Sequence, residues 1–212
     1  RAIRGEDGGS AFISRLVTAT SILLGALVLI SIIAAPLLVR IFASSYVGRP
    51  EFHLTLLFMR YCLPQIFFMG LFALLGQVAN AKGRFGPMMW APVFNNIVSI
   101  AVFGYFLHAS KGWTVQSISH GQASLFALGT TAGYVVQLAV LIPVIRHTGI
   151  RIRARFDWRD PELKKSLHLA GWTLAFAAFS QLSYLVTVNL STGAAVRALK
   201  EGISTGVGFT PF

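Results

Sequence analysis

The sequence is poor in charge, and above all in acidic residues. Charged residues make up 12% of its 212 residues, and only seven of them are Asp or Glu. A soluble domain carries about 25% charged residues, so this chain lacks the polar surface that a globule of its size needs. All seven carboxylates lie near the charged ends of apolar runs and none lies inside one. This deficit argues against a soluble enzyme and favours a membrane protein.

Groups that carry catalysis or bind metal ions are also scarce. Cys62 is the single cysteine, so the chain has no disulfide framework of its own. The five histidines lie at or near the ends of apolar runs and share no metal-ligand spacing. No Walker loop, GxSxG or HExxH motif occurs in the sequence. We therefore expect no cofactor and no metal site, and a membrane enzyme is the weakest of the possible readings.

Long apolar runs are what the sequence has in abundance. Hydrophobic residues make up 55% of the chain, and a helix needs about 20 apolar residues to cross the hydrocarbon core. Only helices and closed barrels satisfy every backbone group in lipid, and runs this continuous do not show the alternation of a barrel. The predicted fold is all-α, a polytopic transmembrane helical bundle in a single transmembrane region. Its five predicted spans cover about residues 13–40, 57–81, 87–108, 122–146 and 166–195.

The distribution of Lys and Arg predicts an orientation. The segment through Arg15, the turn 82–84 and the connection 146–165 together hold twelve, whereas the connections on the other side hold six. Because cytoplasmic loops are enriched in Lys and Arg, we expect a multi-pass membrane protein with its N-terminus in the cytoplasm. The net charge of +11 then needs no nucleic-acid partner.

The boundaries of the chain suggest a piece of a larger protein. The first residue is Arg rather than Met, the number of predicted spans is odd, and the last residues form no closing structure. We therefore expect an internal fragment.

Polar residues surround the predicted turn between the second and third spans. Gln77 and Asn80 are three residues apart and so share a helical face, and Arg84 follows them in the turn. One interpretation is a polar lining that contacts a lipid headgroup, with the Arg84 guanidinium paired to phosphate. The other is an ordinary helical hairpin in which the amides cap a helix end and Arg84 extends to the interface.

Three prolines lie within or beside predicted spans, at Pro64, Pro92 and Pro143. Each removes a backbone donor and frees a carbonyl one turn earlier, which can create a kink or a hinge. Asn95, just after Pro92, either satisfies the freed backbone or contacts a ligand. Gly129 and Gly133 form a small-xxx-small pair in the fourth run, which predicts close helix packing.

A polar stripe follows the fifth run. Ser180, Tyr184 and Thr187 recur at helical spacing on one face. They line a hydrated cavity or form hydrogen bonds with a neighbouring helix, and the sequence does not separate these two roles. In the preceding connection, Arg151, Arg153 and Arg155 alternate with apolar residues, as expected of a segment beside anionic lipid.

Motifs in the second and third spans resemble one known family. The runs Leu63-Pro64-Gln65-Ile66-Phe67-Phe68 and Gly76-Gln77-Val78-Ala79-Asn80-Ala81-Lys82-Gly83-Arg84-Phe85, followed by Pro87, Ala91-Pro92 and Asn95-Asn96-Ile97, are similar to those of MurJ (MviN) lipid II flippases. That family belongs to the multidrug/oligosaccharidyl-lipid/polysaccharide exporter superfamily. The resemblance covers essentially the whole chain and would make it the third through seventh of about fourteen spans.

The resemblance implies a function. A flippase of this kind moves the undecaprenyl-linked peptidoglycan precursor, lipid II, from the inner to the outer leaflet by alternating access. The resemblance implies the bacterial cytoplasmic membrane as the location. It also implies lipid II and membrane lipids as partners, with cell-wall synthesis proteins as further candidates. The family arginines that engage the diphosphate lie in spans outside this chain, so the resemblance assigns Gln77, Asn80, Arg84 and Asn95 to scaffold and gating before substrate contact. Two alternatives stay open: another exporter of the superfamily, and a non-transporting membrane scaffold of the cell-wall machinery.

Overall fold

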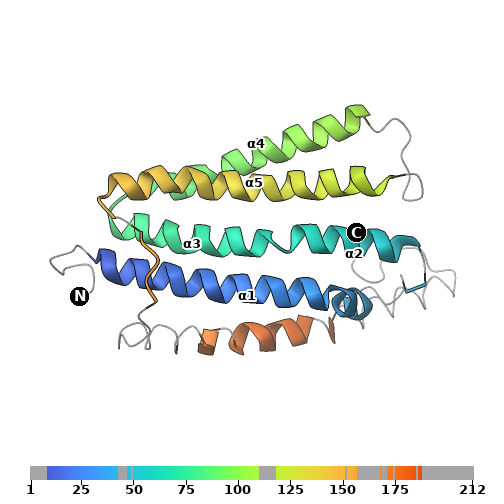
Figure 1. Ribbon diagram of the computed structural model, residues 1–212, viewed down its shortest axis with the longest axis horizontal. Coiled ribbons are helices and arrows are strands. Elements are labelled where there is room, and N and C mark those ends of the chain that lie inside the picture. Colours follow the sequence, from blue (N-terminus) through green and yellow to red (C-terminus); the bar gives the residue numbers. More distant parts are fainter. Residues whose placement is uncertain are drawn as a thin grey trace. The chain divides into compact units, whose positions relative to one another are not determined.

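The computed structural model describes residues 9–42, 47–48, 50–109, 118–150, 152–156, 168, 171–173, 175–184 and 186–187. The chain divides into two compact units, Arg1–Asp157 and Trp158–Phe212. The first unit contains five α-helices, which are α1 (Ser10–Phe42), α2 (Pro50–Cys62), α3 (Gln65–Ala81), α4 (Gly86–Ala109) and α5 (His120–His147) (Figure 1). Among the described residues no strand occurs, and the all-α prediction is confirmed.

Within the described residues, four helical stretches are long and apolar enough to cross a membrane. They are Ser10–Phe42, Phe52–Ala81, Gly86–Ala109 and His120–His147. The second begins at Phe52 rather than near residue 57, and the exposed Arg60 lies within it. The fifth predicted span, 166–195, lies partly outside the described residues, and its described parts between 171 and 187 are helical.

Large apolar side chains cover the outside of the helices. Ile33 and Leu107 are each 79% exposed and Ile30 is 63% exposed. Soluble proteins rarely expose apolar patches on this scale, whereas hydrocarbon is the natural environment of such a surface. The exposed faces of the first unit are therefore suited to contact lipid.

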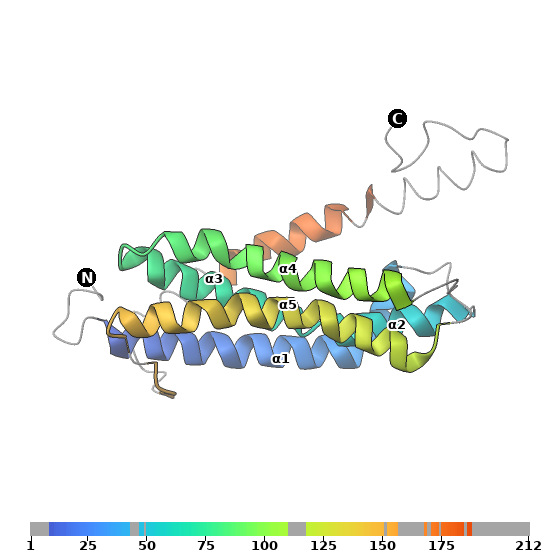
Figure 2. The same cartoon turned by 90° about the horizontal axis from the view of Figure 1, so that it is seen from above.

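The helices of the first unit run up and down beside one another. α1 and α4 run in one direction, and α2, α3 and α5 run in the other (Figures 1 and 2). One end of the unit thus brings together the start of α1, the α3–α4 turn and the connection after α5. We call it the basic end, because it carries the described cations Arg15, Lys82, Arg84, Arg146, Arg153 and Arg155. The three groups that the Lys and Arg count assigned to one side therefore lie together.

Helix α5 occupies the centre of this arrangement. It packs against α4 and also against α2 and α3, while α1 packs against α2 and α3. Its start is fixed by a capping box, in which the Ser119 Oγ accepts from the Gln122 amide at 3.2 Å and the Gln122 Oε1 accepts from the Ser119 amide at 2.9 Å.

Glycines allow the helices to approach closely. A Cβ placed on Gly129 would lie 2.8 Å from a methyl carbon of Val102 on α4, and one on Gly133 would overlap the Asn95 side chain. A Cβ on Gly76 of α3 would lie 2.9 Å from the Met88 sulfur. The close packing predicted from Gly129 and Gly133 is confirmed, and α4 is the helix against which they pack.

Candidate functional site

The α3–α4 hairpin separates two residues that the sequence placed on one face. The Gln77 side chain is exposed, whereas Asn80 is half-buried and its Nδ2 donates to the Met88 sulfur at 3.2 Å. The Asn80 Oδ1 is buried and has no hydrogen-bond partner. Asn80 therefore faces α4 inside the hairpin, while Gln77 faces outward.

Backbone groups close this hairpin. The Lys82 amide donates to Ala79 O at 3.0 Å and the Arg84 amide donates to the same carbonyl at 2.9 Å. Gly83 has a φ of 73°, a conformation that side chains with a Cβ rarely adopt. The end of α3 is thus satisfied by the turn itself. The Arg84 side chain is exposed at the basic end and is available to an anion.

Asn95 lies at the contact of α4 with α5. Its Oδ1 is buried without a hydrogen-bond partner and lies against the backbone of Gly133, where any side chain would overlap it. Its neighbour Asn96 is exposed. The buried carbonyl of Asn95 therefore has a packing role at the α4–α5 contact.

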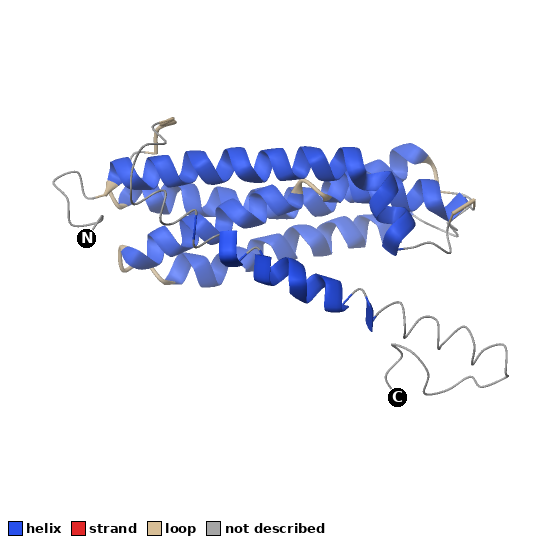
Figure 3. Cartoon of the chain, turned by 90° about the horizontal axis from the view of Figure 1, so that it is seen from below, coloured by secondary structure: helices blue, strands red, loops and turns tan. Residues whose placement is uncertain are grey.

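A polar cluster that the sequence analysis did not identify surrounds the break between α2 and α3. Here the Thr131 hydroxyl of α5 donates to the Tyr61 carbonyl at 2.8 Å. The Gln65 Nε2 lies 3.1 Å from the Thr131 Oγ1 and 3.3 Å from the Thr130 Oγ1. Figure 3 shows the interruption of the helix at this place. The Thr130-Thr131 pair in a charge-free run was the available sequence signal.

The three prolines have different effects on their helices. At Pro64 the helix is broken, and the chain continues with shorter-range bonds from Ile66 N to Leu63 O and from Phe67 N to Pro64 O, both 3.1 Å. Helices α4 and α5 continue through Pro92 and Pro143, and α1 also contains Pro36. Of the three predicted hinges, only Pro64 therefore lies at a break between helices.

The polar stripe of the second unit lies on a helical segment. The described residues Ser180, Tyr184 and Thr187 are all exposed within it. The Thr187 hydroxyl donates to the Ser183 carbonyl at 3.0 Å, which reduces the cost of a hydroxyl in an apolar environment. The stripe can still accept further hydrogen bonds from water or from a partner helix.

The connection after α5 crosses α1. The Arg153 amide donates to the Ser14 Oγ at 3.3 Å, and the Arg155 amide donates to the Thr18 Oγ1 at 3.2 Å. The exposed side chains of residues 152–156 include both arginines, whereas Arg151 lies outside the described residues. The connection is thus fixed to α1 by its backbone, which leaves its charges free to act at the surface.

The predicted site residues belong to different elements of the chain. The amides at positions 77, 80 and 95 and Arg84 belong to the hairpin and to the α4–α5 contact of the first unit, while the stripe 180–187 belongs to the second unit. In the part of the chain that the structure describes, no three His, Cys, Asp or Glu side chains gather as a metal site. The arrangement provides cationic groups at one end and polar groups at helix contacts.

Comparisons with known proteins agree on one family. The family model described as "Lipid II flippase MurJ" matches residues 2–204. The chain is 31% identical to a probable lipid II flippase MurJ of Rhizobium tropici, over 93% of this chain and 35% of that protein. It is 26% identical to the probable lipid II flippase MurJ of Rhizobium meliloti, over 89% of this chain and 34% of that protein. It is also 26% identical to the probable lipid II flippase MurJ of Vibrio cholerae, over 64% of this chain and 24% of that protein. The chain thus spans about a third of the length of the first two relatives.

Proposed function

Because the chain belongs to the MurJ family of lipid II flippases, we propose that it is part of a transporter for lipid II. In this proposal the transporter moves the undecaprenyl-linked peptidoglycan precursor from the inner to the outer leaflet by alternating access. The observation that carries the proposal is the match of the family over residues 2–204. Proteins that supply or consume lipid II are its proposed partners in the cell.

The physical problem of such transport is the headgroup. A diphosphate with attached sugars cannot cross hydrocarbon without a polar path and compensating cations. Long apolar helices hold the described unit in the bilayer, and the exposed Gln77 and Arg84 lie at its basic end. We assign Gln77 and Arg84 to the entry of the headgroup, and Asn80 and Asn95 to the scaffold that positions the hairpin.

The break at Pro64 is the proposed hinge. A break in a membrane helix is tolerated where neighbouring helices satisfy the freed backbone groups, and Thr131 does this for the Tyr61 carbonyl. Such a bond can be exchanged during a movement of α2 relative to α3. Pro92 and Pro143 lie inside continuous helices and are assigned to kinks rather than hinges.

A complementation experiment tests the proposal. The full-length gene product is expressed in a bacterium depleted of its own lipid II flippase, and growth is measured together with the lipid II that an external probe can reach. A flippase restores both, because lipid II then arrives in the outer leaflet. A scaffold or an exporter of another substrate restores neither, and that result would refute the proposal.

We also propose the cytoplasmic membrane as the location, with the basic end in the cytoplasm. In a Cys62→Ser background, Phe85→Cys marks the basic end and His120→Cys marks the opposite end; Phe85 is 62% exposed and His120 is also exposed. An impermeant maleimide should label His120→Cys in intact spheroplasts and Phe85→Cys only after permeabilisation. The reverse pattern would contradict the orientation.

The polar stripe is proposed to line a hydrated cavity. Thr187→Cys should then react with water-soluble thiol reagents in the full-length gene product. Leu182→Cys is the matched control and should not react. Leu182 is 59% exposed, but at about 100° per residue it lies on the opposite side of the helix from Ser180 and Tyr184. Protection of both positions would instead show that the stripe packs against a partner helix.

A further inference from the structure

An apolar groove opens between α3, α5 and the connection after α5. Its volume is about 670 Å³, within the range of about 300–1,000 Å³ that small-molecule sites occupy. The walls are Leu71 and Leu75 of α3 and Leu138, Ile142 and Ile145 of α5. Such walls fit a hydrocarbon chain and offer it no hydrogen bond.

The groove is confined to one leaflet. Leu138 and Arg146 both line it, and at about 1.5 Å per residue they are about 12 Å apart along α5. Arg146 is in the last turn of that helix, at the basic end. With α5 as a membrane span, the groove begins at the last turn of that helix and extends inward by about the depth of one leaflet.

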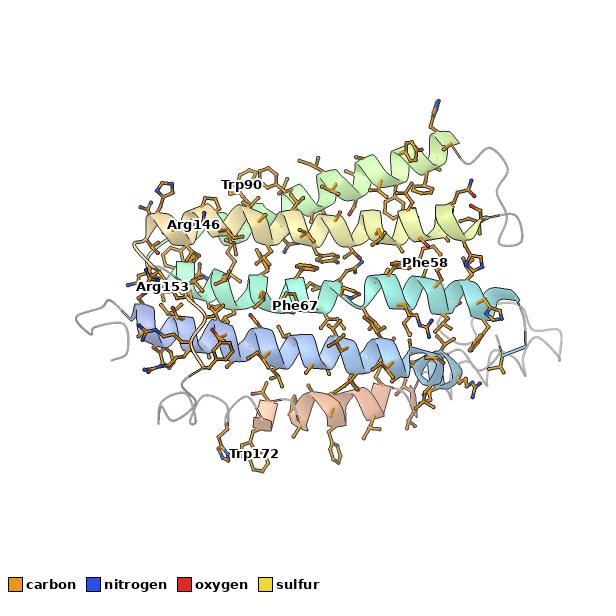
Figure 4. The ribbon with its side chains drawn as sticks, in the orientation of Figure 1. Phe58, Phe67, Trp90, Arg146, Arg153 and Trp172 are labelled. Carbon is orange, nitrogen blue, oxygen red and sulfur yellow. The ribbon has the colours of Figure 1, made fainter. Side chains whose placement is uncertain are left out.

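Two arginines stand at the outer end of the groove. Arg146 comes from α5 and Arg153 from the connection, and both line the groove (Figure 4). The described lining contains these two cations and no carboxylate. Guanidinium groups bind phosphate through paired, charge-assisted hydrogen bonds, so this end of the groove is suited to an anionic headgroup.

The connection is held in place to form this outer end. Ile150 is only 3% exposed and belongs to the apolar core of the basic end. Beyond it, the Arg153 amide is bound to the Ser14 Oγ and the Arg155 amide to the Thr18 Oγ1. The backbone at Arg153 is therefore anchored on both sides, and its side chain lines the groove.

We propose that this groove binds an anionic glycerophospholipid of the surrounding leaflet. One acyl chain lies against Leu75, Leu138 and Ile142, and the phosphate lies between Arg146 and Arg153. This combination of an apolar wall and two arginines at one end is complementary to the acyl chain and the phosphate of a phospholipid. The lipid is a resident ligand rather than transported cargo, and the proposal does not depend on the transported substrate.

Lipid retention tests the proposal. The full-length gene product is extracted in native nanodiscs, transferred to mild detergent, and examined by native mass spectrometry for bound phosphatidylglycerol, cardiolipin, phosphatidylethanolamine and polyprenyl diphosphates. We expect one anionic phospholipid to be retained. Arg146→Gln and Arg153→Gln should each lower its retention about tenfold, the loss expected for one charge-assisted phosphate contact.

Matched controls separate the site from general charge and folding effects. Arg155→Gln removes the same charge from the same connection, but Arg155 does not line the groove, and retention should stay at the wild-type level. Ile142→Trp should abolish retention by filling the groove, whereas Val135→Trp on the same helix should not. These two side chains are 42% and 41% exposed, so neither substitution overpacks a core, and size-exclusion profiles verify folding.

Several results would overturn the proposal. Retention of phosphatidylethanolamine in place of an anionic lipid would show that the two arginines do not select an anionic headgroup. Retention of a polyprenyl diphosphate would make the groove part of the transport path. Absence of any bound lipid from the wild type would show that the groove holds no resident lipid. Equal retention by the Arg146→Gln/Arg153→Gln double variant would show that the retained lipid is not bound by these arginines.

Discussion

Gly133→Ala is expected to destabilise the full-length gene product by about 1–3 kcal/mol, the usual cost of overpacking a tight contact. A Cβ at this position would overlap the Oδ1 of the Asn95 side chain and would lie 3.3 Å from the backbone carbonyl oxygen of Asn95. Gly133 is buried, so α4 and α5 have to separate or the Asn95 side chain has to rotate. Thermal unfolding in detergent, followed by circular dichroism, measures the change.

Gly104→Ala is the matched control on α4. A Cβ there would meet no atom within 4 Å, so the substitution should be neutral or stabilising by up to about 1 kcal/mol through helix propensity. The double variant Asn95→Ala/Gly133→Ala should regain most of the loss of Gly133→Ala, because truncation of Asn95 vacates the space that the methyl group needs. If the losses of the two single variants simply add, the contact does not limit the approach of the helices.

Thr131→Val is expected to cost about 1–2 kcal/mol, more than the average of about 0.6 kcal/mol for interhelical hydrogen bonds in membranes. The substitution preserves shape but removes the donor to the Tyr61 carbonyl, and Thr131 is only 7% exposed. The carbonyl then lacks this partner in an apolar environment beside the helix break. The unfolding midpoint in detergent is again the measurement.

Thr130→Val provides the comparison, because the Thr130 hydroxyl donates to the Ala127 carbonyl of its own helix at 2.8 Å. This substitution should lower the free energy of unfolding by less than Thr131→Val does. In a Pro64→Ala background the helix can continue, and the Tyr61 carbonyl can accept from the amide four residues later. Thr131→Val should therefore cost less in that background than in the wild type. An equal cost in both backgrounds would mean that the threonine does not support the break.

Much of the fold could be predicted because lipid leaves the backbone few choices. Long charge-free runs such as those ending at Ala81 and Ile145 have to be helical, since unpaired backbone groups are too costly in hydrocarbon. The gathering of Arg15, Arg84 and Arg146 at one end also follows from the alternation of span direction. Composition, span positions and charge placement were therefore accessible from the sequence.

The polar residues were harder to interpret, because the sequence shows helical faces but not which neighbour each face meets. Gln77 and Asn80 share a predicted face, yet one is exposed and the other donates to Met88. The role of a proline likewise depends on its surroundings. Pro64 lies at a break where the Tyr61 carbonyl accepts a hydrogen bond from Thr131, 70 residues later in the chain. Helix α5, in contrast, continues through Pro143.

The sequence by itself determined an all-helical membrane protein, its apolar spans and the family motifs around the α3–α4 turn. These features are local, because burial in lipid and a tight turn place requirements on residues that are neighbours in the chain. Only the tertiary structure decided that Gln65, Thr130 and Thr131 form one cluster and that Arg146 and Arg153 border an apolar groove. These groups are brought together by helix packing and by a connection bound across α1. Such contacts between distant segments leave no periodic signal in the chain.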